Sequence, residues 1–308
     1  SFGGPGAVNR ENFDVIVVGC GIAGLSAAIT AQQNGARVAI LERAPIDERG
    51  GNTRDTESFW RMKSIDAVSD DFVERFAANA GGWPDPGIVR DAVRDREDQP
   101  AVLRALGVID PNLIATIAEE APKALKWLSE FGIKFDHLPL YFLNQSTTRM
   151  GPIGGGLALV EALGGYVDAR PEDMTVFYET AARALIQDDR GAIVGVTTVG
   201  PDNTPVEFRG RNVVLASGGF QGNQEMLTHY VGPQAQFVRP VSRGGHYNRG
   251  EGVRMALSVG AAPCGDFGSF HAQPVDPRAI DIEPVVLNYS YGILVNDAGR
   301  RFTDEAPG

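Results

Sequence analysis

Cysteine is scarce in this sequence, with only Cys20 and Cys264 among 308 residues. The two do not form a Cys-x-x-Cys pair, so we expect neither a bound metal nor a redox-active pair. Long apolar runs are lacking as well, since none approaches the roughly 18 residues that a membrane-spanning helix needs. The N-terminus has no charged-then-apolar signal pattern. We therefore expect no membrane insertion and a cytoplasmic location.

Positive charge is also in short supply. Lys and Arg number 28 against 39 Asp and Glu, which gives a formal net charge of −11. Because nucleic-acid binding depends on Lys and Arg neutralising phosphates, this balance excludes DNA and RNA as expected partners. The hydrophobic fraction of 43% is ordinary for a soluble globular protein and is enough to bury a core of one large or two ordinary domains.

A strand, a glycine-rich turn, a helix and a second strand follow one another near the start. The β-branched run FDVIVVG (13–19) predicts a buried parallel strand, CGIAGLSAAITAQQNG (20–35) predicts a helix ending at Gly35, and RVAILE (37–42) predicts the next strand. The glycines at 19, 21 and 24 form a G-x-G-x-x-G pattern between the first strand and the helix. This order is the βαβ fingerprint of a dinucleotide-binding unit.

Each part of the fingerprint has a physical task. Gly19 permits the tight turn, Gly21 lets a pyrophosphate approach the backbone, and Gly24 allows the helix and strand to pack closely. The helix N-terminus supplies amide donors and a positive dipole to the phosphates. Glu42 ends the second strand 18 residues after Gly24 and can accept both ribose hydroxyls.

The segment after Glu42 favours a flavin. In RAPIDERGGNT (43–53) two glycines follow a short loop, where a nicotinamide-binding unit usually has a helix. Here the sequence resembles the FAD-dependent fumarate reductase/succinate dehydrogenase flavoprotein family, whose fold is an α/β, Rossmann-like FAD-binding domain of the two-dinucleotide-binding-domain type, interrupted by a capping domain. The resemblance implies cofactor contacts from Arg43, Gly50, Gly51, Asn52 and Thr53.

Later segments match that family in order. Residues 64–135 are predicted to be mainly helical, with Trp127 and Leu128 in a core. IGGGLALVEAL (153–163) is either a second phosphate-side loop or a plain helix start, and MTVFYETAARALIQDDRGAIVGVTTV (174–199) predicts three strands that resemble the adenine-side hairpin. RNVVLASGGF (211–220) and RGEGVRMALSVGA (249–261) resemble segments that pass close to the flavin. The implied contacts are Gly155, Gly156, Ala182, Ala216, Gly218, Gly219, Gly250, Glu251 and Gly252.

The resemblance also suggests a substrate. GGNTRDT (50–56) with FHAQPVDPRA (270–279) looks most like the tricarballylate dehydrogenases, which implies hydride transfer between flavin N5 and a di- or tricarboxylate, with an electron acceptor of unknown identity. Because no histidine lies between residues 42 and 63, we predict non-covalent FAD. His271 is the first substrate-side candidate, unless it is a solvated turn histidine; Glu283 is a weaker one.

The end of the chain resembles the middle of a family motif. ILVNDAGRRFTDE (293–305) matches a segment that the family follows with a catalytic arginine, which would here be residue 309. We expect a leader at 1–12, an FAD-binding domain at 13–267 and the beginning of a capping domain at 268–308, with the remainder absent. Such a chain is expected to bind FAD loosely and turn over little.

Three alternatives stay open at this point. The same fold hosts 3-ketosteroid dehydrogenases and L-aspartate oxidase-like enzymes, which would respond to steroids and to amino acids respectively. A non-catalytic flavin-binding module is the third alternative, and it would neither bind nor oxidise carboxylates.

Overall fold

The computed structural model describes residues 8–9, 12–56, 59–81, 85–106, 109–137, 148–240, 244–272 and 292–302. The chain divides into two compact units: unit 1 comprises Ser1–Thr56 and Gly154–Pro263, and unit 2 comprises Glu57–Ile153 and Cys264–Gly308. The predicted FAD-binding domain, 13–267, includes residues of both units, and its limits stay a prediction. None of the described helices is long and apolar enough to cross a membrane.

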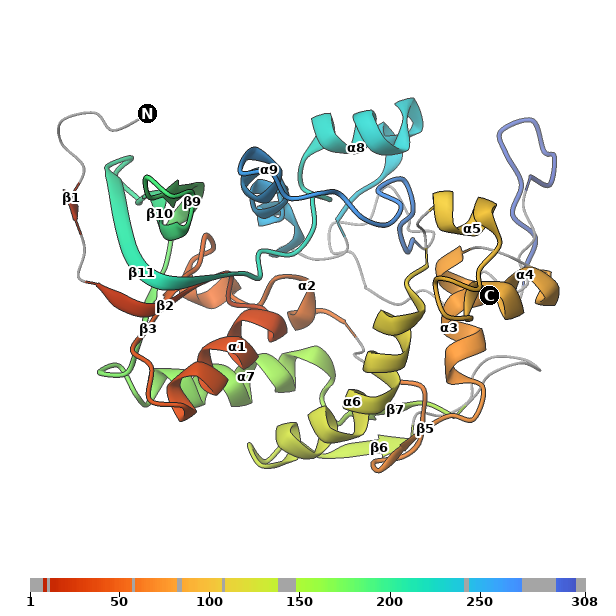
Figure 1. Cartoon of the computed structure of the whole chain (residues 1–308), viewed down its shortest axis with the longest axis horizontal. Helices are drawn as coiled ribbons and strands as arrows, with labels where there is room; N and C mark the ends of the chain where they lie inside the picture. Colours follow the sequence, from red (N-terminus) through yellow and green to blue (C-terminus); the bar gives the residue numbers. More distant parts are fainter. Residues whose placement is uncertain are drawn as a thin grey trace. The chain divides into compact units, whose positions relative to one another are not determined.

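Parallel strands form one side of the sheet of unit 1, from its edge strand β8 (Met174–Phe177) inward (Figure 1). Their order is β8, β3 (Val38–Leu41), β2 (Phe13–Val18) and β11 (Pro205–Leu215). β3 is buried along its whole length, as expected of a strand covered on both faces. Helix α1 (Ile22–Gln33) connects β2 to β3. The strand–helix–strand unit predicted from the sequence is therefore present.

Strand β11 belongs to two parts of the sheet. Its second half, from Gly210, pairs in parallel with β2, whereas its first half pairs antiparallel with β10 (Ile193–Val199). β10 in turn pairs with β9 (Ala181–Gln187), and the short strand β1 (Val8–Asn9) lies parallel to the start of β11. Figure 1 shows β11 as one long curved strand between the β9–β10 hairpin and β2. The backbone N–H of Thr180, just before β9, donates to the carbonyl of Glu42 (2.9 Å), which brings the hairpin beside the end of β3.

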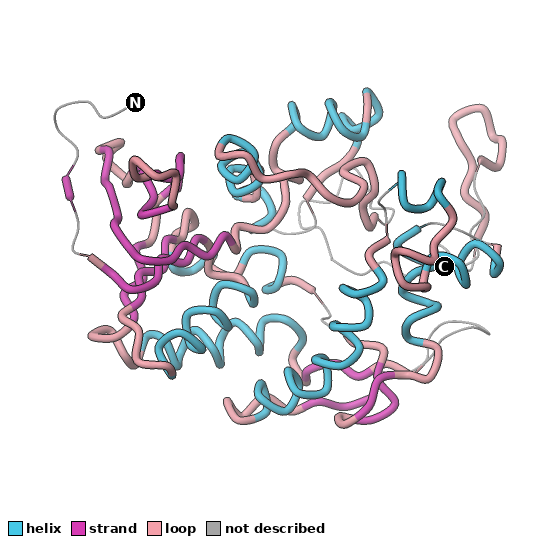
Figure 2. Tube along the Cα trace, in the orientation of Figure 1, coloured by secondary structure: helices cyan, strands magenta, loops and turns pink. Residues whose placement is uncertain are grey.

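Helices pack against this sheet. α7 (Gly155–Asp168) runs beside α1 (Figures 1 and 2). α9 (Glu251–Ser258) contributes Met255 to a core that also contains Ala182 and Phe208. The remaining helical segments of unit 1 are α2 (Gly51–Arg54), α8 (Gln224–Val231) and the 3-10 turns Ile46–Glu48, Pro233–Phe237 and Gly244–Tyr247.

Unit 2 is mainly helical, as predicted for residues 64–135. Its helices are α3 (Phe72–Gly81), α4 (Pro86–Ala92), α5 (Ala101–Leu106) and α6 (Pro111–Ser129). Asp110 caps α6 by accepting the backbone N–H groups of Asn112 and Leu113, and Pro111 occupies the first helical position, where its missing N–H costs nothing. The short hairpins are β4 (Met62–Ser64) with β5 (Ala67–Val68), and β6 (Phe135–His137) with β7 (Met150–Pro152).

The core prediction for α6 is half right. Leu128 is buried, but Trp127 is only half-buried and its ring packs edge-on against Phe131. The two residues are adjacent in the helix, so they point about 100° apart around the axis and only one of them can face the core squarely.

Candidate dinucleotide-binding site

The turn from β2 into α1 is built so closely that it admits only glycine at two positions. Gly19 has φ +110°, and a Cβ there would lie 2.4 Å from the carbonyl oxygen of Ala216. A Cβ on Gly24 would lie 1.9 Å from the carbonyl oxygen of Gly19. A Cβ on Gly21 would have its nearest neighbour, the carbonyl oxygen of Gly50, at 3.4 Å. Close packing therefore requires the outer two glycines, and Gly21 keeps the backbone open to an approaching ligand.

The N-terminus of α1 lies beside the predicted Gly-Gly loop. Gly21, at the N-cap position, has no side chain to satisfy the helix's first amides. The backbone N–H of Ile22 instead donates to the Thr53 hydroxyl at 3.1 Å. Gly50 precedes α2 with φ +112°, and a Cβ there would meet Val160 of α7 at 2.8 Å. The Gly-Gly pair thus lets α2 pack against α7 while Thr53 reaches the positive end of α1.

Glu42, at the end of β3, is buried and held by main-chain amides. Its Oε2 accepts from the N–H of Cys20 at 2.8 Å, and its Oε1 accepts from the N–H of Ala44 at 2.7 Å. Burial raises the pKa of this carboxyl, and the main-chain donors oppose the rise. Each oxygen has a further lone pair, so the oriented carboxylate can still accept hydroxyl groups of a ligand.

A cavity of ≈ 420 Å³ in unit 1 brings most of the predicted cofactor residues together. Its wall includes the β2–α1 turn, the end of β3, the Gly-Gly loop, the start of β9 and the loop after β11. The predicted residues that line it are Gly19, Gly21, Glu42, Arg43, Gly50, Gly51, Asn52, Thr53, Ala182, Ala216, Gly218 and Glu251.

The other predicted cofactor residues lie outside the lining. Gly24 lets α1 pack against the turn. Gly155 and Gly156 are the first residues of α7. Gly252 lies so close to Ser217 that a Cβ there would meet the Ser217 hydroxyl at 2.1 Å. The N–H of Gly250 donates to the carbonyl of Gly219 at 3.1 Å. Contacts of these residues with a cofactor stay a prediction.

Several lining residues were missed by the sequence motifs. Asn248 places its side-chain oxygen 3.0 Å from where a Cβ of Gly218 would be. Burial, and after it the neighbouring Glu48 carboxylate, raises the pKa of the Tyr247 hydroxyl. Their position in the sequence was the signal that could have identified them, because Tyr247 and Asn248 directly precede the motif that begins at Arg249. The missed residues with polar side chains are Cys20, Glu48, Thr180, Ser217, Tyr247 and Asn248.

Of the two predicted substrate-side residues, His271 lies within the described part of the chain. His271 belongs to unit 2 and its side chain is exposed. Glu283 lies outside the described residues. The segment that resembles the family motif near the chain end forms a tight turn, in which the Asn296 side chain accepts from the backbone N–H groups of Ala298 and Arg300. Among the described residues, no group of three or more His, Cys, Asp or Glu is arranged to hold a metal ion.

The chain is similar to known flavin-binding proteins and oxidoreductases. A family model described as "FAD binding domain" matches residues 14–308. An NADH:fumarate oxidoreductase of Klebsiella pneumoniae is 26% identical over 318 residues, which cover 96% of this chain and 30% of that protein. A urocanate reductase of Eggerthella lenta is 31% identical over 229 residues, which cover 70% of this chain and 33% of that protein. The chain therefore spans about a third of the length of these curated relatives.

A solved structure shares the fold. The 3-ketosteroid-Δ4-(5α)-dehydrogenase of Rhodococcus jostii RHA1 aligns over 82% of this chain and 55% of its own, with a TM-score of 0.61 and 23% identity. The predicted fold class, an α/β FAD-binding flavoprotein, is confirmed by this likeness and by the family match.

Proposed function

Because this chain belongs to the FAD-binding domain family, with FAD as its cofactor, we propose that it is the FAD-binding part of an oxidoreductase that transfers a hydride between FAD and a small di- or tricarboxylate. The observation that carries the proposal is the cavity in which the β2–α1 turn, Glu42 and the Gly-Gly loop converge. The relatives named for fumarate and urocanate reduction support the reaction class.

The residues of the cavity fit FAD. The open backbone at Gly21 and the N-terminus of α1 suit a pyrophosphate, which needs amide donors and a positive dipole. Glu42 suits the adenosine ribose, because its carboxylate is oriented by two main-chain donors and lines the cavity. Ala182, near the start of β9, lines the cavity and is the residue from which the family resemblance implies a backbone contact to adenine. Bound FAD supplies the hydride-transfer chemistry, and the chain supplies binding and orientation.

For the substrate we propose a carboxylate, and within that class a tricarboxylate such as tricarballylate as the finer assignment. GGNTRDT and FHAQPVDPRA are the segments that motivate it. His271 is the proposed clamp on a substrate carboxylate, since an exposed imidazole can donate a charge-assisted hydrogen bond. Glu283 is proposed as a second substrate-side residue.

The first test is the visible absorbance spectrum of the purified protein, followed by heat release and identification of the chromophore. We expect a yellow protein that yields free FAD, because no histidine lies between residues 42 and 63 for covalent attachment. A protein that stays colourless after incubation with excess FAD would contradict the proposal.

The second step distinguishes substrates by titrating the FAD-loaded protein with fumarate, succinate, tricarballylate, L-aspartate and 4-androstene-3,17-dione. Perturbation of the flavin spectrum by the di- or tricarboxylates alone is the expected result. A response to the steroid alone or to aspartate alone would replace the carboxylate assignment with one of those two alternatives, and no response to any of them would favour a flavin-binding module.

A further inference from the structure

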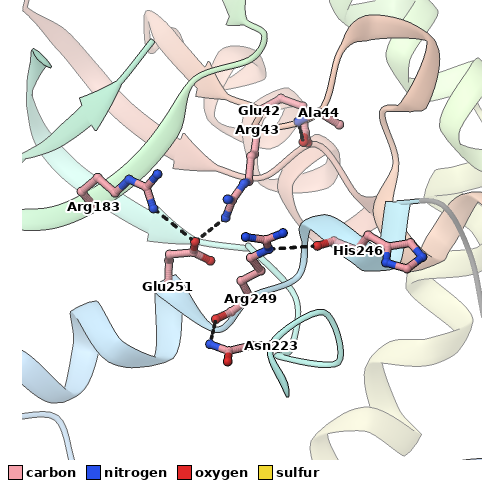
Figure 3. Close-up of polar contacts among 8 residues, drawn as sticks. All are labelled: Glu42, Arg43, Ala44, Arg183, Asn223, His246, Arg249 and Glu251. Carbon is pink, nitrogen blue, oxygen red and sulfur yellow. Dashed lines mark hydrogen bonds and ion pairs between the residues drawn. The ribbon is translucent and has the colours of Figure 1, made fainter. Parts of the chain in front are cut away.

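Glu251 is the meeting point of two arginines from distant parts of the chain. Its Oε1 pairs with the guanidinium of Arg43, at the end of β3, and with that of Arg183, in β9, at 3.5 Å (Figure 3). Both arginines point to the same carboxylate, which is about one-fifth exposed. We call these three residues the Glu251 cluster. It joins β3, β9 and α9 at one place.

The sequence positions Glu251 through the packing of α9. Met255 lies in the core with Ala182, and Glu251 lies four residues before it, hence on the same face of the helix. That face meets β9, where Arg183 follows Ala182. Gly252 lets the helix start close to Ser217, since a Cβ there would meet the Ser217 hydroxyl at 2.1 Å.

Hydrogen bonds also hold the segment that directly precedes α9. The Asn223 side chain donates a hydrogen bond to the carbonyl of Arg249 at 2.9 Å, and the Arg249 side chain donates one to the carbonyl of His246 at 3.4 Å (Figure 3). Tyr247, in the same segment, lines the cavity together with Glu48, which lies near the Gly-Gly loop. The ion pair of Glu251 with Arg43 therefore joins the segment 244–251 to the end of β3.

The three members of the Glu251 cluster differ in their relation to the cavity. Arg43 and Glu251 line it, whereas Arg183 does not. Arg183 is about half exposed, and its side chain meets the cavity wall at the Glu251 carboxylate. Arg183 can therefore act on a bound dinucleotide through Glu251.

We propose that Arg183 is a positioning residue that holds the Glu251–Arg43 wall of the cavity in place and thereby slows the release of FAD. The inference rests on the proposed FAD binding. With Arg183 present, Glu251 is drawn toward β9 as well as toward Arg43, so the first turn of α9 stays against the hairpin. Without it, Glu251 keeps a single partner and the first turn of α9 is less restrained.

The test measures FAD release from the whole chain by the rise of FAD fluorescence after dilution. Arg183→Gln is expected to speed release about threefold at low salt, the scale of a partly exposed ion pair. Arg183→Lys should restore most of the parent rate, because it keeps the charge. Added KCl should speed release from the parent more than from Arg183→Gln, since salt screens a pair that the variant has already lost.

A matched control is available in the same sheet. Arg209 of β11 is exposed to a similar degree and pairs with Glu207 at 2.9 Å, away from the cavity lining. Arg209→Gln should leave FAD release unchanged. Equal release from Arg183→Gln, Arg209→Gln and the parent would overturn the proposal, as would a failure of Arg183→Lys to rescue. A parent chain that binds no FAD would instead overturn the proposed function and this inference with it.

Discussion

The reactivity of the Cys20 thiol, in the glycine-rich turn, is determined by the residues around it. It lies between Gly19 and Gly21, is fully buried, and its main-chain N–H holds the Glu42 carboxylate. Burial, reinforced by the charge of Glu42, raises the pKa of the Cys20 thiol to about 12. Because the thiolate is the reactive form, this thiol is protonated and inert at neutral pH although it lines the cavity.

Iodoacetamide at pH 8 is therefore expected to label one thiol of the native chain. Cys264 is exposed and should react, whereas Cys20 should not, because pH 8 lies far below its raised pKa. Intact mass and peptide mapping measure the result. Cys264→Ser should remain unlabelled when native and gain one label in urea. Rapid labelling of native Cys264→Ser would contradict the expectation, since it would mean that Cys20 reaches solvent as a thiolate.

At the scale of elements, the strand–helix unit was predictable because its pattern is local. The β-branched run, the spaced glycines and Gly35 after the helix identified β2, α1 and β3. The β4–β5 hairpin was not predicted. It begins just before the stretch 64–135, which was predicted to be helical, and ends inside it. Its strands are two or three residues long, too short for a period-2 pattern to be distinguished from a helical one.

Gly24→Ala tests whether close packing of α1 requires glycine. We expect the free energy of unfolding to fall by about 1–3 kcal/mol, because the Cβ would lie 1.9 Å from the Gly19 carbonyl oxygen, and this overpacking outweighs the gain in helix propensity of about 1 kcal/mol. Urea unfolding measures the change.

Gly165→Ala is the matched control. Gly165 lies within α7, and nothing lies within 4 Å of a Cβ added there. The same substitution should therefore stabilise the chain by about 0.5–1 kcal/mol. If both variants were stabilised, the closeness of the β2–α1 turn would not be the reason for Gly24.

At the scale of the whole molecule, the cavity draws on segments of unit 1 that are separated by up to about 230 residues. Its lining runs from the β2–α1 turn to Glu251 and consists entirely of residues of unit 1. A ligand that binds this cavity stabilises the native state by mass action, about 2.7 kcal/mol at a concentration of 100 times its Kd. That stabilisation should first suppress openings of the segments that form the cavity.

Hydrogen exchange with and without FAD is the corresponding measurement. FAD is expected to slow amide exchange in β2, α1, β3 and the start of α9, and to leave α6 of unit 2 unchanged under native conditions. Free adenosine added at the same concentration is the control for weak, nonspecific binding. Protection of α6 equal to that of α1 would contradict the expectation that the effect is confined to unit 1.

The local parts of this protein could be predicted from the amino-acid pattern alone: the strand and helix of the fingerprint, the glycine positions, the acid at the end of β3, and the family they resemble. These follow from short-range sterics and periodicity, which are properties of neighbouring residues. Three long-range features became visible only in the folded chain: Thr53 meets the N-terminus of α1, Tyr247 and Asn248 line the cavity, and Glu251 joins Arg43 and Arg183. Those contacts depend on how α2 packs against α7 and how α9 packs through Met255, and no pattern within a single segment records such long-range packing.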